Sequence, residues 1–194
     1  MNKQYNNSMN INKINLKTPE ERKLYDDYSY FIYGLVKQYE PKTTFEIGLG
    51  PTANTTCAVV QAIYENSLND GIVGHHYVLD ISPTDEAKQK IATLPQELFT
   101  LRIGDSKEAE KYCNLKNGMI DILLVDGNHT TEYCFNDTIL PILTNNFNIE
   151  SGIIVFHDTQ MASVRQAIIA LKEKLKLSTF FFPKISVGVA KIKF

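Results

Sequence analysis

The sequence contains few cysteines, and they lie far apart. Cys57, Cys113 and Cys134 are the only three in 194 residues, and no two of them form a C-x-x-C pair. This spacing argues against a disulfide framework and against a zinc site built from cysteines. It also suits a reducing compartment. We therefore expect three buried, inert thiols in a cytoplasmic protein.

An excess of positive charge and long apolar stretches are also missing. The 20 lysines and arginines are outnumbered by 22 aspartates and glutamates, which gives a net charge of −2. A chain without a basic excess lacks the electrostatic footprint of a nucleic-acid-binding protein. No apolar run is long enough to cross a membrane, and the polar first residues lack the apolar core of a signal peptide. We expect neither nucleic acid nor membrane as a partner, and a homo-oligomer stays open.

The most informative stretch that is present is a glycine-containing turn. Residues 43–47 are β-branched, aromatic or acidic and predict a buried strand, while residues 52–65 predict a helix. Between them, Gly48, Gly50 and Ala53 match the nucleotide-fold fingerprint G-x-G-x-x-G/A. Glycines at such a turn allow a ligand to approach the backbone closely. The stretch therefore predicts a cofactor site.

Glu46 lies near the end of the first predicted strand. Open α/β sheets bind their ligands at the carboxyl ends of the strands. A buried carboxylate there is costly unless it has a cationic or hydrogen-bonding partner. We expect a bound cofactor to provide that partner.

Beyond the glycine turn, strand-like and helix-like segments alternate. Strands are expected at 76–81, 98–103, 120–125, 152–156, 179–182 and 187–192, and helices at 84–94, 107–115, 130–143 and 161–175. Pro141 is expected to kink or end its helix early. The last two strands are close enough to form an antiparallel pair. The pattern predicts an α/β fold with a doubly wound, mostly parallel seven-stranded sheet and an antiparallel C-terminal hairpin.

The first 42 residues are expected to form an arm and a covering helix, ahead of a domain at 43–194. Thr18, Pro19 and Glu21 resemble a capped helix start. Apolar residues follow at helical spacing: Leu24, Tyr28, Phe31, Leu35 and Tyr39. We favour a helix that packs on the sheet. The alternative is a lid over a substrate pocket, lined by Tyr25, Tyr28, Tyr30 and Tyr33.

Acidic residues fall at or just beyond the ends of five predicted strands: Glu46, Asp80, Asp105, Asp126 and Asp158. In a doubly wound sheet these ends form one edge, so the carboxylates should converge on one crevice. Asp80 follows the second strand, where an acid accepts hydrogen bonds from ribose hydroxyls in nucleotide-binding folds. The sequence predicts a nucleotide-like cofactor at this edge.

These motifs resemble those of class I S-adenosylmethionine-dependent methyltransferases. Residues 45–50, Phe-Glu-Ile-Gly-Leu-Gly, resemble the glycine-rich first motif of that family, and Asp80 matches its ribose-binding acid. Gly104-Asp105-Ser106 resembles the segment beside the adenine, and the last two strands resemble the family's signature hairpin. The resemblance implies a Rossmann-like methyltransferase that binds S-adenosylmethionine through Glu46, Gly48, Gly50, Asp80, Ile81, Asp105, Ser106 and Asp126.

Two further motifs resemble one branch of that family. Residues 125–130 read Val-Asp-Gly-Asn-His-Thr, and residues 155–159 read Val-Phe-His-Asp-Thr. Similar motifs occur in macrocin-type O-methyltransferases and in cephalosporin-hydroxylase-like proteins. The resemblance implies O-methylation of a small-molecule acceptor such as a sugar or polyketide hydroxyl. It also implies that Asp126, His157 and Asp158 hold a divalent metal, Mg²⁺ or Mn²⁺, and that His129 acts as a base beside a catalytic Asp126.

Elementary geometry agrees with part of this assignment. Neighbouring strands lie about 4.8 Å apart, so Asp126 and Asp158 at adjacent strand ends could share one cation. Metal-dependent relatives often carry a carboxylate where His157 stands. A histidine there favours Mn²⁺ over Mg²⁺, or no metal at all.

Two other functions stay open. A nicotinamide-dependent oxidoreductase shares the glycine fingerprint, but it predicts further parallel strands in place of a hairpin. A non-catalytic cofactor-binding subunit would bind the cofactor without turnover. A methyltransferase acting on nucleic-acid bases is disfavoured, because residues 126–129 read Asp-Gly-Asn-His where such enzymes carry a D/N-P-P-aromatic motif.

Overall fold

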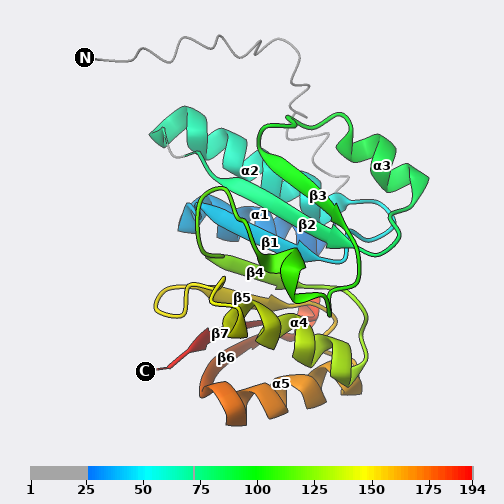
Figure 1. Ribbon diagram of the computed structural model, residues 1–194, viewed down its shortest axis with the longest axis vertical. Helices are drawn as coiled ribbons and strands as arrows, with labels where there is room; N and C mark the ends of the chain where they lie inside the picture. The colour runs from blue at the N-terminus through cyan, green and yellow to red at the C-terminus, as the bar shows by residue number, and fades with distance from the viewer. Residues whose placement is uncertain (1–25, 72, 194) are drawn as a thin grey trace.

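The computed structural model describes residues 26–71 and 73–193. Seven strands form one sheet in the order β3-β2-β1-β4-β5-β7-β6 (Figure 1). Their bounds are β1 Thr43–Ile47, β2 His75–Asp80, β3 Phe99–Ile103, β4 Ile122–Val125, β5 Ile153–Phe156, β6 Leu177–Phe182 and β7 Val187–Ile192. Strands β1 to β5 are parallel, and β7 is antiparallel to β5 and β6. The predicted sheet and its C-terminal hairpin are confirmed.

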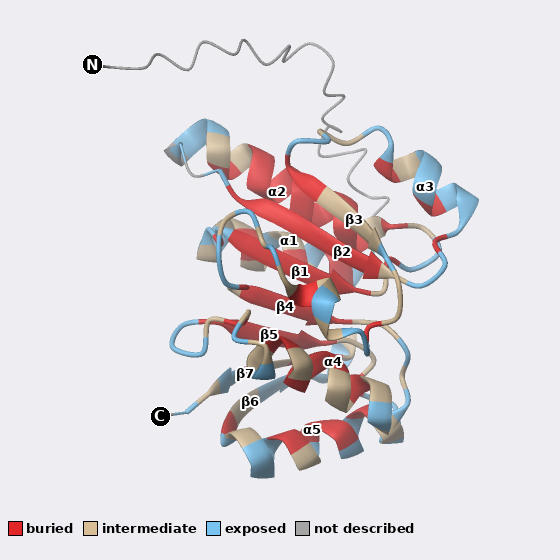
Figure 2. Cartoon of the chain, in the orientation of Figure 1, coloured by how far each residue is buried: buried red, intermediate tan, exposed pale blue. Residues whose placement is uncertain are grey.

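Five α-helices are described, and they cover both faces of this sheet. They are α1 Asp27–Tyr39, α2 Asn54–Asp70, α3 Asp85–Ile91, α4 Thr131–Leu143 and α5 Ala162–Leu175. Buried residues of α1, α2 and α3 pack on one face, and those of α4 and α5 pack on the other. As a result β1, β4 and β5 are buried along their whole length (Figure 2). None of the helices in this described part is long and apolar enough to cross a bilayer.

The N-terminal helix packs into the core. Helix α1 begins at Asp27, where Asp26 accepts a hydrogen bond from the backbone N–H of Ser29 at 2.7 Å. The expected start at Thr18 and Pro19, and the expected arm, lie outside the described residues. Tyr28, Ile32 and Val36 are buried against α2, and the predicted stripe of Phe31, Leu35 and Tyr39 flanks them. This is the packing role that we favoured. The division into domains at residue 42 stays a prediction.

The structure departs from the expected helices at residues 107–115 and at Pro141. Residues 107–115 form only a 3₁₀ turn, Ala109–Tyr112, because the Tyr112 hydroxyl is tied to the Ser106 carbonyl and Asn114 turns the chain at φ +56°. Helix α4 continues through Pro141 to Leu143, so of the two effects expected of Pro141, a kink or an early end, the early end does not occur. Pro141 lies in the last turn of α4 and removes one backbone hydrogen bond there.

Candidate functional site

The glycine turn after β1 brings two backbones into contact. Gly48 has φ +92°, and a Cβ placed on it would lie 2.2 Å from the carbonyl oxygen of Asp126. The close approach that demands glycine is therefore made by β4, whereas we expected a ligand. Gly50, at φ +66°, has open space where a Cβ would stand. Helix α2 begins two residues later than expected, after Ala53 at φ +49°.

A cavity of about 300 Å³ opens at the carboxyl ends of β1 to β4. Its lining includes all of the expected cofactor residues except Glu46: Gly48, Gly50, Asp80, Ile81, Asp105, Ser106 and Asp126. Asp80 accepts hydrogen bonds from the backbone N–H groups of Leu49 at 2.9 Å and Ser82 at 2.7 Å. The Asp80 carboxylate, at the end of the neighbouring strand β2, thus holds the glycine turn in place.

Tyr133 also lines this cavity, and the sequence reasoning missed it. Its hydroxyl donates to Asp105 Oδ2 at 3.1 Å, and the ammonium of Lys107 lies over its ring. Its position could have indicated a place in the site, because it lies in the first turn of α4, shortly after His129 and Thr130. That turn faces the edge of the sheet where the strands end.

Glu46 is placed differently from our expectation. It is fully buried on the α2 side of β1 and does not line the cavity. Its Oε2 accepts a hydrogen bond from the Thr56 hydroxyl at 2.6 Å and lies 2.9 Å from His76 Nε2, within hydrogen-bond distance. Protein side chains thus partner Oε2, whereas the buried Oε1 has no hydrogen-bond partner among the described residues. Phe45 and Ile47, its neighbours along β1, point to the other face of the sheet, and a role of Glu46 toward the cofactor stays a prediction.

Burial shifts the pKa values of both Glu46 and His76 toward their neutral forms. It lowers the pKa of His76 to about 3, so the ring is neutral. The Thr44 hydroxyl lies 2.7 Å from Nδ1 of this ring and can either donate to it or accept from it. Burial raises the pKa of Glu46 well above its ordinary value, and the hydrogen bond from Thr56 opposes that rise.

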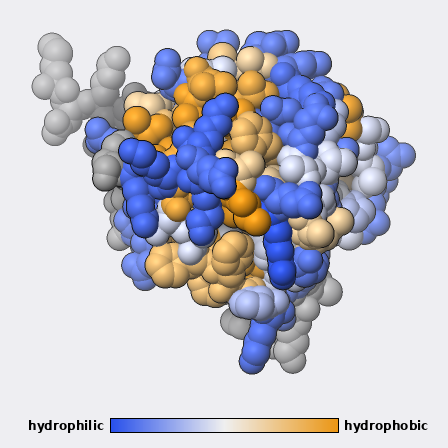
Figure 3. Space-filling view, turned by 90° about the horizontal axis from the view of Figure 1, so that it is seen from below, coloured by the Kyte–Doolittle hydropathy of each residue, from blue (hydrophilic) through white to orange (hydrophobic). Residues whose placement is uncertain are grey.

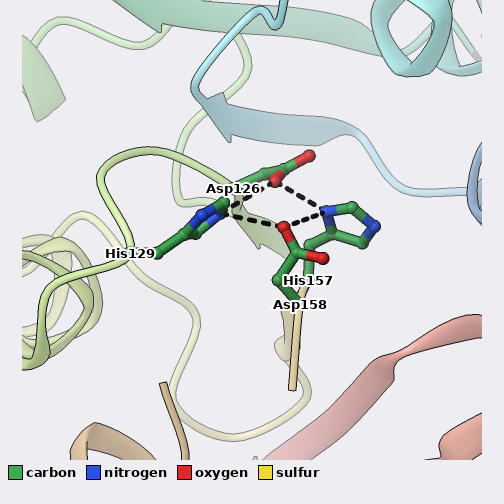
Figure 4. Close-up of side chains that lie close together, drawn as sticks. All are labelled: Asp126, His129, His157 and Asp158. Atoms are coloured by element: carbon green, nitrogen blue, oxygen red, sulfur yellow. Dashed lines mark hydrogen bonds and ion pairs between the residues drawn. The ribbon is translucent and has the colours of Figure 1, made fainter. Parts of the chain in front are cut away.

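Four other polar side chains meet where β4 and β5 end. Asp126, His129, His157 and Asp158 offer donor atoms that lie within 4.8 Å of one another (Figure 4). His157 Nδ1 is 2.8 Å from Asp126 Oδ1, and His129 Nε2 is 3.3 Å from Asp158 Oδ2. Asp158 reaches this position through a left-handed backbone conformation, φ +51°. The structure therefore brings together all four residues expected to carry metal or base chemistry.

The two carboxylates favour positive charge on both histidines. The pKa of His129 is raised, chiefly by the nearby Asp126 carboxylate, 3.6 Å from Nε2, and further by the charge of Asp158. Burial alone would lower the pKa of His157, but Asp126 and Asp158 outweigh it and the pKa is raised. These four groups therefore form one electrostatic unit.

The donor set fits a divalent metal ion. Among the described residues, this cluster alone groups three or more potential metal ligands, and it combines two carboxylates with two imidazoles. Carboxylates suit Mg²⁺ and Mn²⁺, whereas imidazoles suit softer ions. The mixture favours Mn²⁺ or a similar borderline ion over Mg²⁺.

Tyr28 of α1 closes one side of the cluster. Its ring stacks on that of His157 with centroids 4.0 Å apart, and it is 5% exposed. Burial is the main cause that raises its pKa well above the ordinary value, and the charges of Asp126 and Glu46 add to the effect. The tyrosine belongs to the core, as we favoured, and also touches the site, as the lid alternative required.

Comparisons with known proteins agree with this geometry. The family model described as "Methyltransferase domain" matches residues 45–159. No curated protein matches the chain. Similar solved structures include the SAH-bound methyltransferase PaMTH1 of Podospora anserina, with 15% identity, a TM-score of 0.69 and coverage of 92% of this chain and 83% of that one.

Two further structures share the fold. A putative caffeoyl-CoA O-methyltransferase from Staphylococcus aureus has 16% identity, a TM-score of 0.62 and coverage of 86% and 83%. The O-methyltransferase TomG from Streptomyces achromogenes, solved with SAM, has 10% identity, a TM-score of 0.64 and coverage of 86% and 80%. The family does not favour the oxidoreductase and non-catalytic alternatives. With its matched segment spanning both the glycine turn and the four-residue cluster, the chain belongs to the methyltransferase-domain family and is a class I S-adenosylmethionine-dependent enzyme.

Proposed function

We propose that the protein transfers a methyl group from S-adenosylmethionine to a hydroxyl of a small molecule. The observation that carries this proposal is the place of Asp126. This residue lines the cofactor cavity and also belongs to the cluster with His129, His157 and Asp158. A methyl donor in the cavity would therefore lie beside groups able to deprotonate an alcohol. The O-methyltransferases among the structures of the same fold support this choice of acceptor atom.

Each end of the cavity offers a recognition group for the cofactor. Asp80 faces the region expected for the ribose, and Gly50 leaves room for the amino-acid part. Asp105 and Ser106 stand where the adenine is expected. We propose Gly48, Gly50, Asp80, Ile81, Asp105, Ser106 and Asp126 as the cofactor-binding residues.

His129 can serve as base or as metal ligand, but one nitrogen cannot do both at once. Its Nε2 is the atom that faces Asp126 and Asp158, at 3.6 Å and 3.3 Å. Without a metal, the neutral form of this ring accepts the hydroxyl proton at Nε2, a role that typically contributes about 10²–10⁴-fold to the rate. With a metal held by Asp126, His157 and Asp158, the ion would lower the pKa of the hydroxyl.

Cofactor choice is the first test. S-adenosylhomocysteine at a hundred times its dissociation constant should stabilise the protein by about 2.7 kcal/mol, measured as a rise in melting temperature. NAD should give no rise. Asp80→Ala should weaken the effect of S-adenosylhomocysteine, and exposed Asp85→Ala on α3 serves as the matched control. Stabilisation by NAD alone would refute the proposal.

Turnover of a hydroxylated acceptor distinguishes the two roles of the cluster. His129→Ala should bind S-adenosylhomocysteine normally and lose about 10²-fold or more in turnover. If a metal takes part, chelation should abolish turnover, and Asp126→Asn and Asp158→Asn should lose activity non-additively because both serve one ion. Full activity in all three variants would exclude oxygen methylation at this cluster.

A further inference from the structure

A second cavity lies beside the cluster, on the side away from the cofactor cavity. It measures about 370 Å³, a volume within the range of small-molecule sites, and it is formed by the loop after β5, by α5 and by the end of β6. Strand β6 runs parallel to β5, since both are antiparallel to β7. The end of β6 is therefore at the same edge of the sheet as Asp126 and Asp158. We call this cavity the α5–β6 groove.

The groove is connected to the cluster by a short chain of contacts. Gln160 lines the groove and donates a hydrogen bond to Asp158 Oδ1 at 2.9 Å. Thr159, the next lining residue, accepts from Arg165 Nε at 2.7 Å through its carbonyl oxygen. A molecule in the groove would thus touch residues adjacent to Asp158. The order along the sheet edge is cofactor cavity, cluster, groove.

The walls of the groove combine apolar surface with positive charge. Phe181, Ile169 and Pro183 supply the apolar part, and the Phe181 ring packs against Gly188 beside the Thr159 methyl group. Hydrophobic residues bordered by hydrophilic ones gather on the face to which α5 and β6 contribute (Figure 3). Arg165 and Lys172 line the same groove, on the exposed side of α5.

The two cations of the groove are available for a ligand. Neither Arg165 nor Lys172 forms an ion pair with any carboxylate of the described residues. Arg165 uses Nε on the Thr159 carbonyl, and a guanidinium has further N–H donors in a planar fork that matches a carboxylate or phosphate. In a protein with net charge −2, this is a local concentration of positive charge on an apolar floor.

We propose that the α5–β6 groove binds the far end of the methyl acceptor, and that this acceptor is an amphipathic molecule with an apolar body and a carboxylate or phosphate group. The inference rests on the proposed function: the hydroxyl sits at the cluster, with the methyl donor on one side and the rest of the acceptor extending into the groove. Arg165 and Lys172 select the anion, and Phe181 and Ile169 bind the apolar body.

The test uses a matched pair of probes, 3,4-dihydroxycinnamate and its uncharged amide, titrated calorimetrically into the full chain saturated with S-adenosylhomocysteine. The carboxylate should bind about tenfold more tightly than the amide or better. The double variant Arg165→Gln, Lys172→Gln should bind the two probes equally. The double variant Lys191→Gln, Lys193→Gln removes the same charge from the far end of β7 and should keep the preference.

The apolar wall is tested separately. Phe181→Ala should lower the affinity for both probes by a similar factor of about 5 to 10 and leave the preference for the carboxylate intact. In steady-state turnover, the Arg165 and Lys172 variants should raise KM for the carboxylate with little change in kcat.

The outcomes separate the groove from the proposed function. No binding of the carboxylate, or equal binding of both probes by the wild type, overturns the groove proposal while cofactor binding still stands. If the wild type does not bind S-adenosylhomocysteine, the proposed function itself is refuted. A concentration-dependent dimer that the Arg165 and Lys172 variants abolish, without any change in probe binding, would show that a second copy occupies the groove.

Discussion

At the scale of single residues, Asp137 on α4 should give the protein an unusual pH dependence. This carboxyl is fully buried beside Gly127, and burial raises its pKa to about 7, with the nearby Ser106 opposing the rise. In the unfolded chain it titrates near its ordinary value of 3.8. Between these values the folded state binds more protons than the unfolded state. Stability therefore falls as pH rises from about 4 to 7 on account of this residue.

Asp137→Asn removes this dependence. The variant should match the wild type near pH 4 and exceed it above pH 7 by up to about 4 kcal/mol, since each pKa unit corresponds to about 1.4 kcal/mol. Burial lowers the pKa of His75 to about 4 and that of His76 to about 3. These two residues therefore make stability rise with pH, opposite to the effect of Asp137. The quantity to measure by denaturant unfolding is therefore the difference between the two proteins. A difference independent of pH would contradict the prediction.

Tyr28 offers a second residue-scale prediction. Its buried hydroxyl has no hydrogen-bond partner among the described residues, whereas its ring stacks on His157. Tyr28→Phe should leave the free energy of unfolding unchanged or raise it, because it removes an unsatisfied polar group. Tyr28→Ala should cost about 3 kcal/mol through the cavity that it leaves. Thermal or denaturant unfolding of both variants decides the matter, and equal losses would show that the hydroxyl carries the effect.

At the scale of elements, helix α3 is linked to the glycine turn through one side chain. Thr84 caps α3 by accepting from Ala87 N–H at 3.1 Å, and its hydroxyl lies 2.9 Å from the carbonyl oxygen of Pro51, to which it donates. Thr84→Ala should cost about 1 kcal/mol of stability. It should also weaken the binding of S-adenosylhomocysteine several-fold, because the glycine turn loses its hydrogen bond to Thr84. Thr93→Ala, just beyond the other end of α3, is the matched control and should do neither.

Most of the elements could be predicted because their patterns are strong. Strand β4 is an apolar run that suits burial on both faces, and β1 and β7 have the bounds that the sequence predicts. The 3₁₀ turn at Ala109–Tyr112 could not be predicted, because a hydrogen bond from the Tyr112 side chain to the nearby Ser106 carbonyl overrides a helical pattern. Helix α5 is uncapped by any side chain, and its pattern alone gave its extent to within a residue.

The site was predicted less evenly than the fold. The expected carboxyl ends of the strands identified Asp80, Asp126 and Asp158 as site residues, because parallel strands bring these ends to one edge of the sheet. The sequence did not show that Glu46 faces away from the cavity, because proximity to a strand end does not say which face of the sheet a side chain takes. Asp137 was not anticipated, because it sits on a helix, where an acid normally faces solvent.

At the scale of the whole molecule, the cofactor cavity spans the ends of four strands that lie side by side. Hydrogen exchange should therefore slow together in the loops after β1, β2, β3 and β4 when S-adenosylhomocysteine binds, since all four line one cavity. The edge strand β6 should exchange faster than the fully buried β1 and should not respond. Exchange followed by mass spectrometry would contradict this picture if only one loop were protected.

Gly48 has one more consequence, for how such an enzyme can diversify. Because Gly48 has no side chain, its backbone packs directly against the carbonyl group of Asp126. This main-chain contact sets the distance between the cavity proposed for the methyl donor and the cluster that contains His129. Replacing side chains around His129 or along α5 leaves that distance unchanged. Point substitutions at such positions can therefore change which acceptor is bound without changing the distance between the methyl donor and the acceptor hydroxyl. A side chain at position 48 would disturb every acceptor alike.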